Sequence, residues 1–426
     1  MQVGAVSRRY AYDRAGNLIR SEDRRGGTLE YVYDKLGRIR EAKHSGGSVE
    51  RFAFDPAGNI LSANHPAAAK SGRLKTPANP NLYAGNRLKE HDGTEYTYDG
   101  LGNLIYRQLP DGENQYFQYD SENQLVRAEI KKAAGNTEIW EYAYDPFGRR
   151  LSKERKDKLA WTSTEPKRIH FVWDGSRLAQ EYTYKGTYTY IYTDQDSYEP
   201  LAQIFHNNKD GKQYLAYIHT DQIGIPREMT DQFGNLLWYG EYSAWGRLKR
   251  DGRVYQNAHQ PFRLQNQYYD RETGLHYNLM RYYEPDTGRF VNQDPIGLDG
   301  GSNLYWFAPN SQGWIDPLGL DELYALIARK DGWYPVMEWG KKNPVGYMYL
   351  KKGELWKIGT SKNASKRYSQ RYLDSIGSTA KRQLGVDMKI IHRDISLKST
   401  RFWERLRIVG YEAWKGFLPP GNKCRH

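Results

Sequence analysis

The chain has 426 residues, of which 38% are hydrophobic and 14% aromatic. No run of about 18 apolar residues occurs, so the sequence predicts neither a membrane-spanning helix nor a signal peptide. The single cysteine, Cys424, excludes an intrachain disulfide framework and a multi-cysteine zinc site. The 36 tyrosines and 41 glycines favour many short strands joined by tight turns.

The net charge of +12 lies entirely in the C-terminal quarter. Residues 321–426 contain 22 basic and 10 acidic side chains, whereas residues 1–320 contain 41 of each. This step predicts two regions with different partners, the second attracted to a polyanion such as nucleic acid. A solvated basic surface without a ligand is the alternative, because charge excess also sets solubility.

A repeat with a period near 21 residues runs through the first 150 residues. In each copy, an aromatic residue and Asp are followed three residues after the Asp by Gly or Asn, with the Asp at positions 13, 34, 55, 99, 120 and 145. An alternating strand that ends at Asp, which can cap a turn, before a residue with positive φ predicts a β-hairpin. Stacked hairpins predict a long twisted sheet with tyrosines along one side, so we interpret the Tyr and Asp residues as scaffold.

This pattern resembles the YD repeats of Rhs proteins, teneurins and the C components of insecticidal Tc toxins. The resemblance covers about residues 1–250. It implies a mainly β scaffold, a shell-like twisted sheet of hairpins around the C-terminal segment. It also implies that the chain is the C-terminal part of a larger protein, or a truncated or orphan copy, served by secretion machinery through a missing upstream region.

A more specific stretch follows in residues 251–320. It contains Arg281-Tyr282-Tyr283-Glu284-Pro285-Asp286-Thr287-Gly288-Arg289-Phe290, and then two Asp-Pro-x-Gly-Leu boxes that begin at Asp294 and Asp316. The stretch resembles the Rhs-associated core. In that family the end of the second box, here Leu320, marks where a conserved shell gives way to a variable toxin, and the charge step falls at the same residue.

The two boxes lie 22 residues apart, and their aspartates suggest acid–base catalysis. Two carboxylates close in space can share a proton, so that one acts as base and the other as acid on a peptide bond. The resemblance implies self-cleavage after Leu320 with Asp294 and Asp316 as the acting pair. Arg289 is a candidate to stabilise one carboxylate or the developing oxyanion. The alternative is that both aspartates are Asp-Pro turn residues.

Residues 321–426 predict a small α+β domain. Residues 345–350 and 355–359 are expected to form a hairpin around a turn at 351–354. A helix is expected at 361–372 and a second at roughly 399–414. This order resembles the GIY-YIG nuclease family, with residues 346–349 as the first motif and residues 357–359 as the second, where a lysine replaces the family's tyrosine.

The resemblance implies phosphodiester hydrolysis, which needs a divalent ion, a cation that holds the phosphate and a base that activates water. Glu404 is the candidate ligand for Mg²⁺ or another divalent cation, because one carboxylate plus waters and substrate oxygens can hold a hard cation. Arg367 matches the family's helix arginine and is expected to clamp the phosphate. Arg371, four residues later on the same helical face, is expected to add a contact.

Three further residues complete the candidate site. Tyr347 and Tyr349 alternate to one side of a strand, so either can approach the nucleophilic water. Asn422 is expected to hold the metal-bound glutamate or the substrate backbone. Each has a structural alternative: core packing for the tyrosines, a surface position for the arginines and Glu404, and a turn for Asn422.

We therefore expect the C-terminal part of an Rhs-type antibacterial toxin. Its metal-dependent nuclease domain is expected to cut DNA, ahead of RNA, in the cytoplasm of a target cell after release by self-cleavage. The partners expected are nucleic acid and a cognate, acidic immunity protein. The alternatives are an RNA- or tRNA-cleaving toxin on the same architecture, and a YD-repeat binding or adhesion scaffold with an inert tail.

Overall fold

The computed structural model describes residues 7–62, 81–161, 163–195, 197–295, 297, 303–316, 322–337, 343–361, 370–378 and 384–392. The chain divides into two compact units, Met1–Pro317 and Leu318–His426. Each unit has hydrophobic clusters of its own. Within the described ranges, no helix is both long enough and apolar enough to span a membrane.

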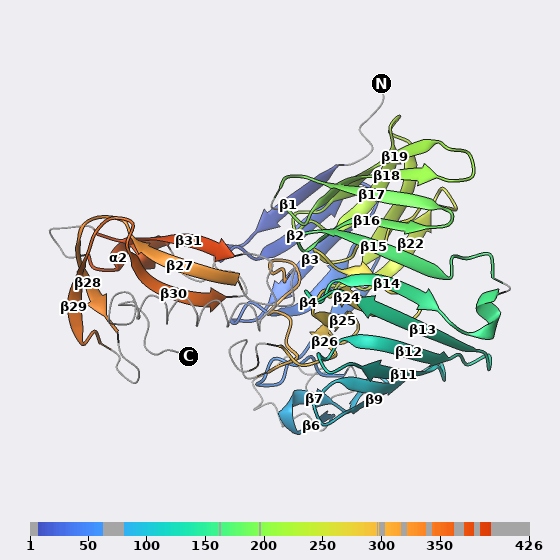
Figure 1. The fold of residues 1–426 in the computed structure, drawn as a ribbon, viewed down its shortest axis with the longest axis horizontal. Coiled ribbons are helices and arrows are strands. Elements are labelled where there is room, and N and C mark those ends of the chain that lie inside the picture. Colours follow the sequence, from blue (N-terminus) through green and yellow to red (C-terminus); the bar gives the residue numbers. More distant parts are fainter. Residues whose placement is uncertain are drawn as a thin grey trace. The chain divides into compact units, whose positions relative to one another are not determined.

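The first unit consists mainly of two antiparallel sheets in which sequence neighbours pair (Figure 1). The first sheet contains β1 (Arg8–Tyr12), β2 (Leu18–Asp23), β3 (Gly27–Tyr33), β4 (Ile39–His44) and β5 (Val49–Arg51). The second is described as 15-stranded and contains β8 (Glu90–His91), β9 (Thr94–Tyr98), β10 (Leu104–Gln108), β11 (Asn114–Tyr119), β12 (Leu125–Lys131), β13 (Thr137–Tyr144), β14 (Arg150–Arg155), β15 (Arg168–Asp174), β16 (Arg177–Thr183), β17 (Gly186–Tyr192), β18 (Pro200–Asn207), β19 (Gln213–Thr220), β20 (Pro226–Asp231), β21 (Leu236–Tyr242) and β22 (Leu248–Arg253). The prediction of a mainly β fold built from hairpins is confirmed.

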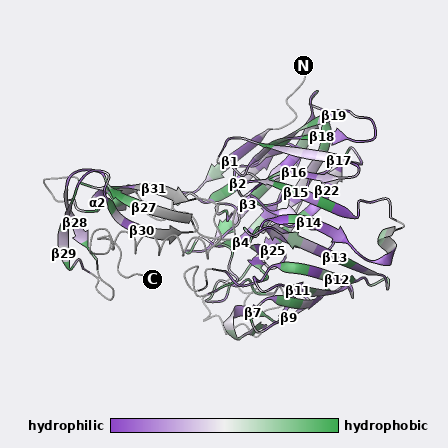
Figure 2. Cartoon of the chain, viewed as in Figure 1, coloured by the Kyte–Doolittle hydropathy of each residue, from purple (hydrophilic) through white to green (hydrophobic). Residues whose placement is uncertain are grey.

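Shorter elements complete this unit. They are the pair β6 (Leu82–Tyr83) and β7 (Arg87–Leu88), the 3₁₀ turns at Ala84–Asn86 and Lys158–Trp161, and a small sheet of β23 (Tyr268–Tyr269), β24 (His276–Asn278), β25 (Arg281–Glu284) and β26 (Arg289–Phe290). Figure 2 shows hydrophilic and hydrophobic residues mixed along the strands, as expected for sheets with one face covered.

The repeated Asp residues build the turns as the sequence predicts. Asp13 Oδ1 accepts hydrogen bonds from the backbone amides of Ala15 and Asn17, both at 2.9 Å, and Gly16 has φ +84°. The same pattern recurs at Asp34, Asp55, Asp99, Asp120, Asp145 and Asp231. These carboxylates satisfy their own turn amides, so they are scaffold groups.

The Tyr-x-Tyr strands cover their inner face with rings. Tyr31, Tyr96, Tyr142 and Tyr190 are all at most 6% exposed and belong to two hydrophobic clusters. The register shifts by one residue at the repeat tyrosine, for example between Ala143 and Tyr144. Such a bulge twists the strand pair, which fits a sheet that curves around its contents.

The described residues of 258–316, which we call the inner segment, lie against the inner faces of both sheets. Its residues Leu264, Tyr283 and Phe307 pack in the cluster that contains the first sheet and β19–β21. Tyr268 and Tyr277 pack in the cluster that contains residues of β9–β13 and β15–β17. In Figure 1, β24–β26 accordingly lie between the two sheets.

Buried ion pairs join the inner segment to the long sheet. Arg150 makes two hydrogen bonds to Asp270, at 2.5 and 2.9 Å, and both side chains are fully buried. Lys153 lies 3.0 Å from both Asp270 and Glu272. Because an unpaired buried charge is costly, these contacts fix which strands the inner segment must face.

The second unit is smaller. Its described elements are β27 (Glu322–Ala328), β28 (Gly332–Val336), β29 (Gly346–Leu350), β30 (Leu355–Ser361), α2 (Gln370–Ser375) and β31 (Val386–His392). β27 is the central strand of a sheet with the order β30-β27-β31, and β28 pairs with β29 (Figure 1). The core of the unit contains Leu326, Tyr334, Leu350, Trp356 and Val386.

The prediction that residues 345–350 pair with residues 355–359 in a hairpin is wrong. Both segments are strands, but β29 pairs with β28, and β30 pairs with β27. The strand β27, which the sequence analysis did not anticipate, supplies the apolar central position, since Leu326 and Ala328 are at most 1% exposed. Of the residues 361–372 expected to form a helix, Ser361 ends strand β30 instead, residues 370–372 lie in α2, and the others lie outside the described residues. The helix expected at 399–414 also lies outside the described residues.

Candidate functional site

Asp294 and Asp316, the two predicted junction carboxylates, are both buried in the first unit. Their side chains are 3% and 4% exposed. The Asp294 amide donates to the Leu304 carbonyl at 2.7 Å, and the Gly297 amide donates back to the Asp294 carbonyl at 2.8 Å. The first Asp-Pro-x-Gly box is therefore a closed turn, and it holds its carboxylate inside the unit.

One guanidinium bridges the two carboxylates. Arg281 Nη1 lies 3.1 Å from Asp294 Oδ2, and Arg281 Nη2 donates to Asp316 Oδ2 at 2.9 Å. The Arg281 side chain is fully buried and lies over the Phe290 ring, 3.6 Å from its centroid. A cation between two carboxylates compensates one of their charges, which allows both to be buried close together.

The turn between β24 and β25 positions this bridge. Asn278 and Arg281 are paired across the turn, and the Asn278 side-chain amide donates to the Asp316 carbonyl at 2.8 Å. Leu279, inside the turn, has φ +52°, which is strained for a branched side chain. Asp316 is thus held through both its backbone and its side chain by one tight turn.

Arg289, the arginine proposed from the sequence, has another role. It donates to the Asn59 side chain at 3.0 Å and to the Asn86 carbonyl, and it lies over the Tyr305 ring. Arg281 takes the place expected for it. Sequence reasoning missed Arg281 because its partners lie 13 and 35 residues away, and strand alternation gives no sign of them.

Leu320, the residue before the expected cleavage point, lies outside the described residues. The division between the two units falls after Pro317, next to Asp316. Asp316 is therefore the last described residue of the first unit.

In the second unit, Tyr347 and Tyr349 lie on β29 and are 64% and 49% exposed. Their neighbour across the hairpin, Trp333, is 58% exposed. Core packing, the structural alternative for the two tyrosines, is therefore wrong. Both phenol groups are open to solvent, where a substrate can reach them.

The other candidate nuclease residues are not brought together by the described part of the structure. Arg371 lies in α2, and nothing is described of its side chain. Arg367, Glu404 and Asn422 lie outside the described residues. Among the residues that are described, no group of three or more His, Cys, Asp or Glu side chains is arranged to hold a metal ion.

Arg329, which directly follows β27, stabilises the second unit by binding carboxylates of two of its elements. Its guanidinium donates to Asp374 in α2 and to Asp387 on β31, both at 2.7 Å. Hydrogen bonds to these two carboxylates raise the pKa of Arg329 above its ordinary value. Arg329 is therefore a structural cation and is not available to a phosphate.

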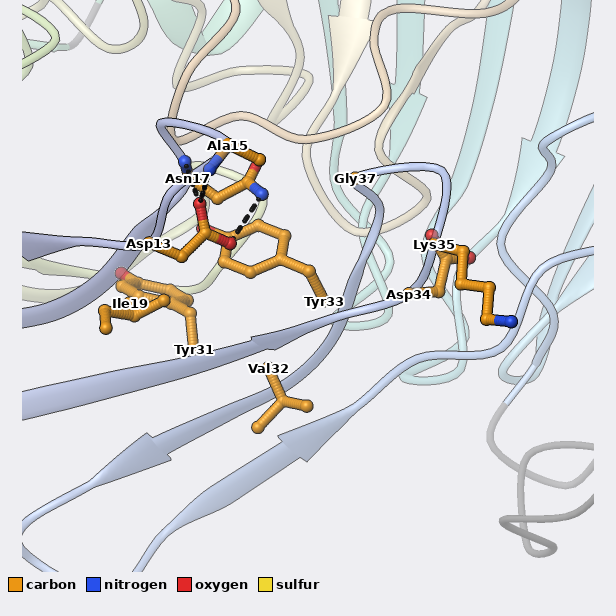
Figure 3. Close-up of a pocket in the computed structure, with 10 residues that line it drawn as sticks. All are labelled: Asp13, Ala15, Asn17, Ile19, Tyr31, Val32, Tyr33, Asp34, Lys35 and Gly37. Carbon is orange, nitrogen blue, oxygen red and sulfur yellow. Dashed lines mark hydrogen bonds between the residues drawn. The ribbon is translucent and has the colours of Figure 1, made fainter.

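A pocket lies between the first two repeat turns (Figure 3). Figure 3 shows the Asp13 carboxylate turned towards Ala15 and Asn17, with which it makes the turn hydrogen bonds. Asp34 is paired with Arg38 at 2.7 Å. The two carboxylates of this pocket are engaged by their own turns, so we assign it no ligand.

Comparison with known proteins gives two family matches. The Teneurin YD-shell family matches residues 12–300. URI fold toxin 2 matches residues 337–416.

Among the similar relatives is double-stranded DNA deaminase toxin A of Burkholderia cenocepacia, 38% identical over 257 residues, which are 57% of this chain and 18% of that protein. Probable deoxyribonuclease RhsA of Dickeya dadantii is 32% identical over 253 residues, 58% of this chain and 17% of that protein. This chain spans less than a fifth of the length of either relative. A crystal structure of TcdB2-TccC3-Cdc42 matches with a TM-score of 0.48 and 17% identity, covering 74% of this chain and 17% of that one.

Proposed function

This chain belongs to the Teneurin YD-shell family, and from that premise we propose that it is part of an Rhs-type antibacterial toxin. Its first unit is the scaffold, and its basic second unit is a metal-dependent nuclease that hydrolyses phosphodiester bonds, in DNA ahead of RNA. The observation that carries the nuclease proposal is the match of residues 337–416 to URI fold toxin 2, in the region that holds the whole charge excess.

The names of the relatives support an action on nucleic acid. One relative is named a DNA deaminase and another a deoxyribonuclease. Their named activities differ although both align with more than half of this chain. The scaffold therefore does not define the reaction, and the residues of the second unit must do so.

In the proposed site, Arg367 and Arg371 hold the scissile phosphate, and Tyr347 or Tyr349 orients the attacking water. Glu404 is the proposed ligand of Mg²⁺ or another divalent cation, with Asn422 beside it. A bound divalent ion supplies charge neutralisation at the phosphate. The exposure of Tyr347 and Tyr349 supports this assignment, since a catalytic hydroxyl must reach the substrate.

Release of the nuclease is proposed to follow self-cleavage after Leu320. Asp294 and Asp316 act as the acid and base on that peptide bond, and Arg281 holds them together. The bridge of one buried guanidinium between both carboxylates supports this pairing. The alternative, two structural turn residues, does not require the carboxylates to converge.

Cleavage is tested with the full chain and with Asp294→Asn and Asp316→Asn. Purified wild-type protein should separate into two fragments in a denaturing gel, and the smaller fragment should begin Asp321-Glu322-Leu323. Both variants should stay intact, while Asp286→Asn, an exposed aspartate of the same segment, should cleave as the wild type does. Cleavage that persists in both junction variants would refute the proposed role of the two aspartates.

Nuclease activity is tested with the full chain, with Glu404→Ala and with Glu412→Ala as a matched control. Each protein is incubated with supercoiled plasmid or bulk tRNA, in Mg²⁺ or in EDTA. Plasmid nicking that needs both Mg²⁺ and Glu404 is the expected result. Intact plasmid with cleaved tRNA would move the function to an RNA-cleaving toxin. If neither substrate is cut, the nuclease proposal fails and a binding scaffold becomes the better account.

A producing cell would need protection from such a nuclease. We propose a cognate immunity protein that is acidic, because it must cover a region with an excess of 12 positive charges. Delivery by secretion machinery into the cytoplasm of a target cell belongs to the same proposal.

A further inference from the structure

The hairpin β28–β29 of the second unit has two unlike faces. Tyr334 and Leu350, on the inner face, are at most 2% exposed and pack in the core. Trp333, Tyr347 and Tyr349, on the outer face, are 58%, 64% and 49% exposed. Alternation along a strand explains the separation, but it does not explain why the outer face is aromatic.

The three outer rings are neighbours. Trp333 pairs directly with Tyr349 across the hairpin, and Pro335 pairs with Tyr347. The Trp333 and Tyr349 rings are 5.7 Å apart at an interplanar angle of 79°, so the two rings support each other edge to face. The face is therefore a small row of large, stiff, planar groups open to solvent.

Lysines lie at one end of this row. Lys351 and Lys352 follow β29 directly, Lys330 precedes β28, and all three are exposed. Asp331 and Glu354 are near them in sequence and bind the backbone amides of Lys352 and Lys351, at 2.7 and 2.9 Å. Three exposed lysines therefore flank the aromatic row at the end where β28 begins and β29 ends.

Planar apolar groups beside cations match the chemistry of an unpaired nucleic acid strand. Bases that are not paired expose ring faces that stack on aromatic side chains, while the phosphates bind lysine. In a duplex, the base faces are hidden inside the stack. The charge excess of residues 321–426 favours such a polyanion over an acyl chain or a neutral protein surface.

We propose that Trp333, Tyr347 and Tyr349 form a stacking platform for unpaired bases, so that the second unit binds single-stranded DNA or a locally melted stretch. The inference rests on the proposed function for its class of ligand and adds the strandedness of the substrate. Stacking needs no metal and no hydrolysis, so it can be measured separately from the reaction.

The test uses the full chain in EDTA and fluorescence anisotropy with a labelled single strand of about 12 nucleotides. A matched duplex and the same strand with its bases removed to leave abasic sites serve as comparison ligands. Wild-type protein should bind the intact strand most tightly. Trp333→Ala should weaken that binding about tenfold, the size of one lost stacking contact, and should leave the weaker binding of the abasic strand unchanged.

Two variants separate stacking from folding. Trp333→Phe keeps a ring and should recover most of the affinity, and Tyr372→Ala removes an exposed aromatic on α2 and should leave affinity unchanged. Equal binding by wild type and Trp333→Ala, an equal loss on intact and abasic strands, or tighter binding to the duplex would each overturn the platform. If plasmid and tRNA remain uncut while Trp333→Ala loses strand binding, the nuclease proposal fails and the platform stands.

Discussion

The same Tyr-x-Tyr strand pattern has opposite surroundings in the two units. In the first unit, Tyr142 is 5% exposed, and burial together with the nearby Glu272 carboxylate raises its pKa well above the ordinary value. In the second unit, Tyr347 and Tyr349 have the same spacing and are about half exposed or more. Alternation defines which residues share a face, but a later segment of the chain decides whether that face becomes a core or a surface.

The inner segment makes this difference in the first unit. It covers the tyrosine face with its own aromatic residues and supplies carboxylates to the cations of the long sheet. Substitutions at covered positions should therefore cost more stability than substitutions at open ones.

Removing a carboxylate of the inner segment should have the largest effect. Asp270→Ala leaves Arg150 buried without its partner and removes one of the two partners of Lys153, which should lower the free energy of unfolding of the first unit by about 3–5 kcal/mol. Urea denaturation of the full chain measures this. Asp174→Ala, whose carboxylate is largely exposed and pairs at the surface, should change stability by less than about 1 kcal/mol. Similar losses in both variants would contradict the view that the covered face is held by these pairs.

Acid should weaken the first unit through Glu181. Burial alone would raise the pKa of Glu181, but His259 and the hydroxyl groups of Tyr190 and Tyr268 outweigh it and lower the pKa to about 2. Because the folded-state pKa lies below the ordinary value of 4.5, this carboxylate stabilises the folded unit above pH 4.5. About 3 kcal/mol should be lost progressively as the pH falls towards 2.

Glu181→Gln should remove this part of the pH dependence. Unfolding free energies of wild type and variant, measured in steps from pH 6 downwards, should therefore approach each other in acid. A difference that stays constant over this range would show that Glu181 does not titrate in the folded unit as expected.

The stability cost of substituting a repeat glycine should depend on whether the inner segment covers that glycine. Gly102 and Gly16 have φ of +83° and +84°, so an added Cβ strains both turns equally. At Gly102 the added atom would also lie 2.4 Å from the Gln293 side-chain nitrogen and 2.6 Å from the Tyr305 hydroxyl, whereas nothing lies within 4 Å at Gly16. Gly16→Ala should cost about 1 kcal/mol and Gly102→Ala about 2–3 kcal/mol in thermal denaturation. Equal costs would mean that Gln293 and Tyr305 both move aside freely.

Removing single hydroxyl groups should give the smallest effects. The Tyr142 hydroxyl donates to Glu272 at 3.1 Å in a buried site, so Tyr142→Phe should destabilise the first unit by about 1–2 kcal/mol. Tyr347→Phe, at a position 64% exposed, should change stability by less than about 0.5 kcal/mol. Differential scanning calorimetry of both variants checks the comparison, and a larger loss at Tyr347 would reverse it.

Local signals predicted the first unit well. Asp13 and its repeats make the expected turns, Gly16 has the expected positive φ, and neighbouring hairpins pair in order, because each of these features needs only residues a few positions apart. The sequence also brought attention to Asp294 and Asp316, which the structure joins through one guanidinium.

Contacts over long distances in sequence could not be predicted in this way. Arg281 was missed because it meets Asp316 only when β24, β25 and the end of the unit are folded together. In the second unit, the pairing of β29 with β30 was the natural expectation for adjacent strands. In the structure, β30 pairs with β27 instead, because β27 occupies the centre of the sheet.

The order of the inner segment along the chain has a consequence for synthesis on the ribosome. Arg107, Arg150 and Lys153 emerge well before Asp270, Glu272 and Glu284, the carboxylates that pair with them. The inner face of the growing sheet therefore stays hydrated and uncovered until more than a hundred further residues have been translated. The basic region is translated immediately afterwards, so the scaffold receives the carboxylates of the inner segment late in its own synthesis.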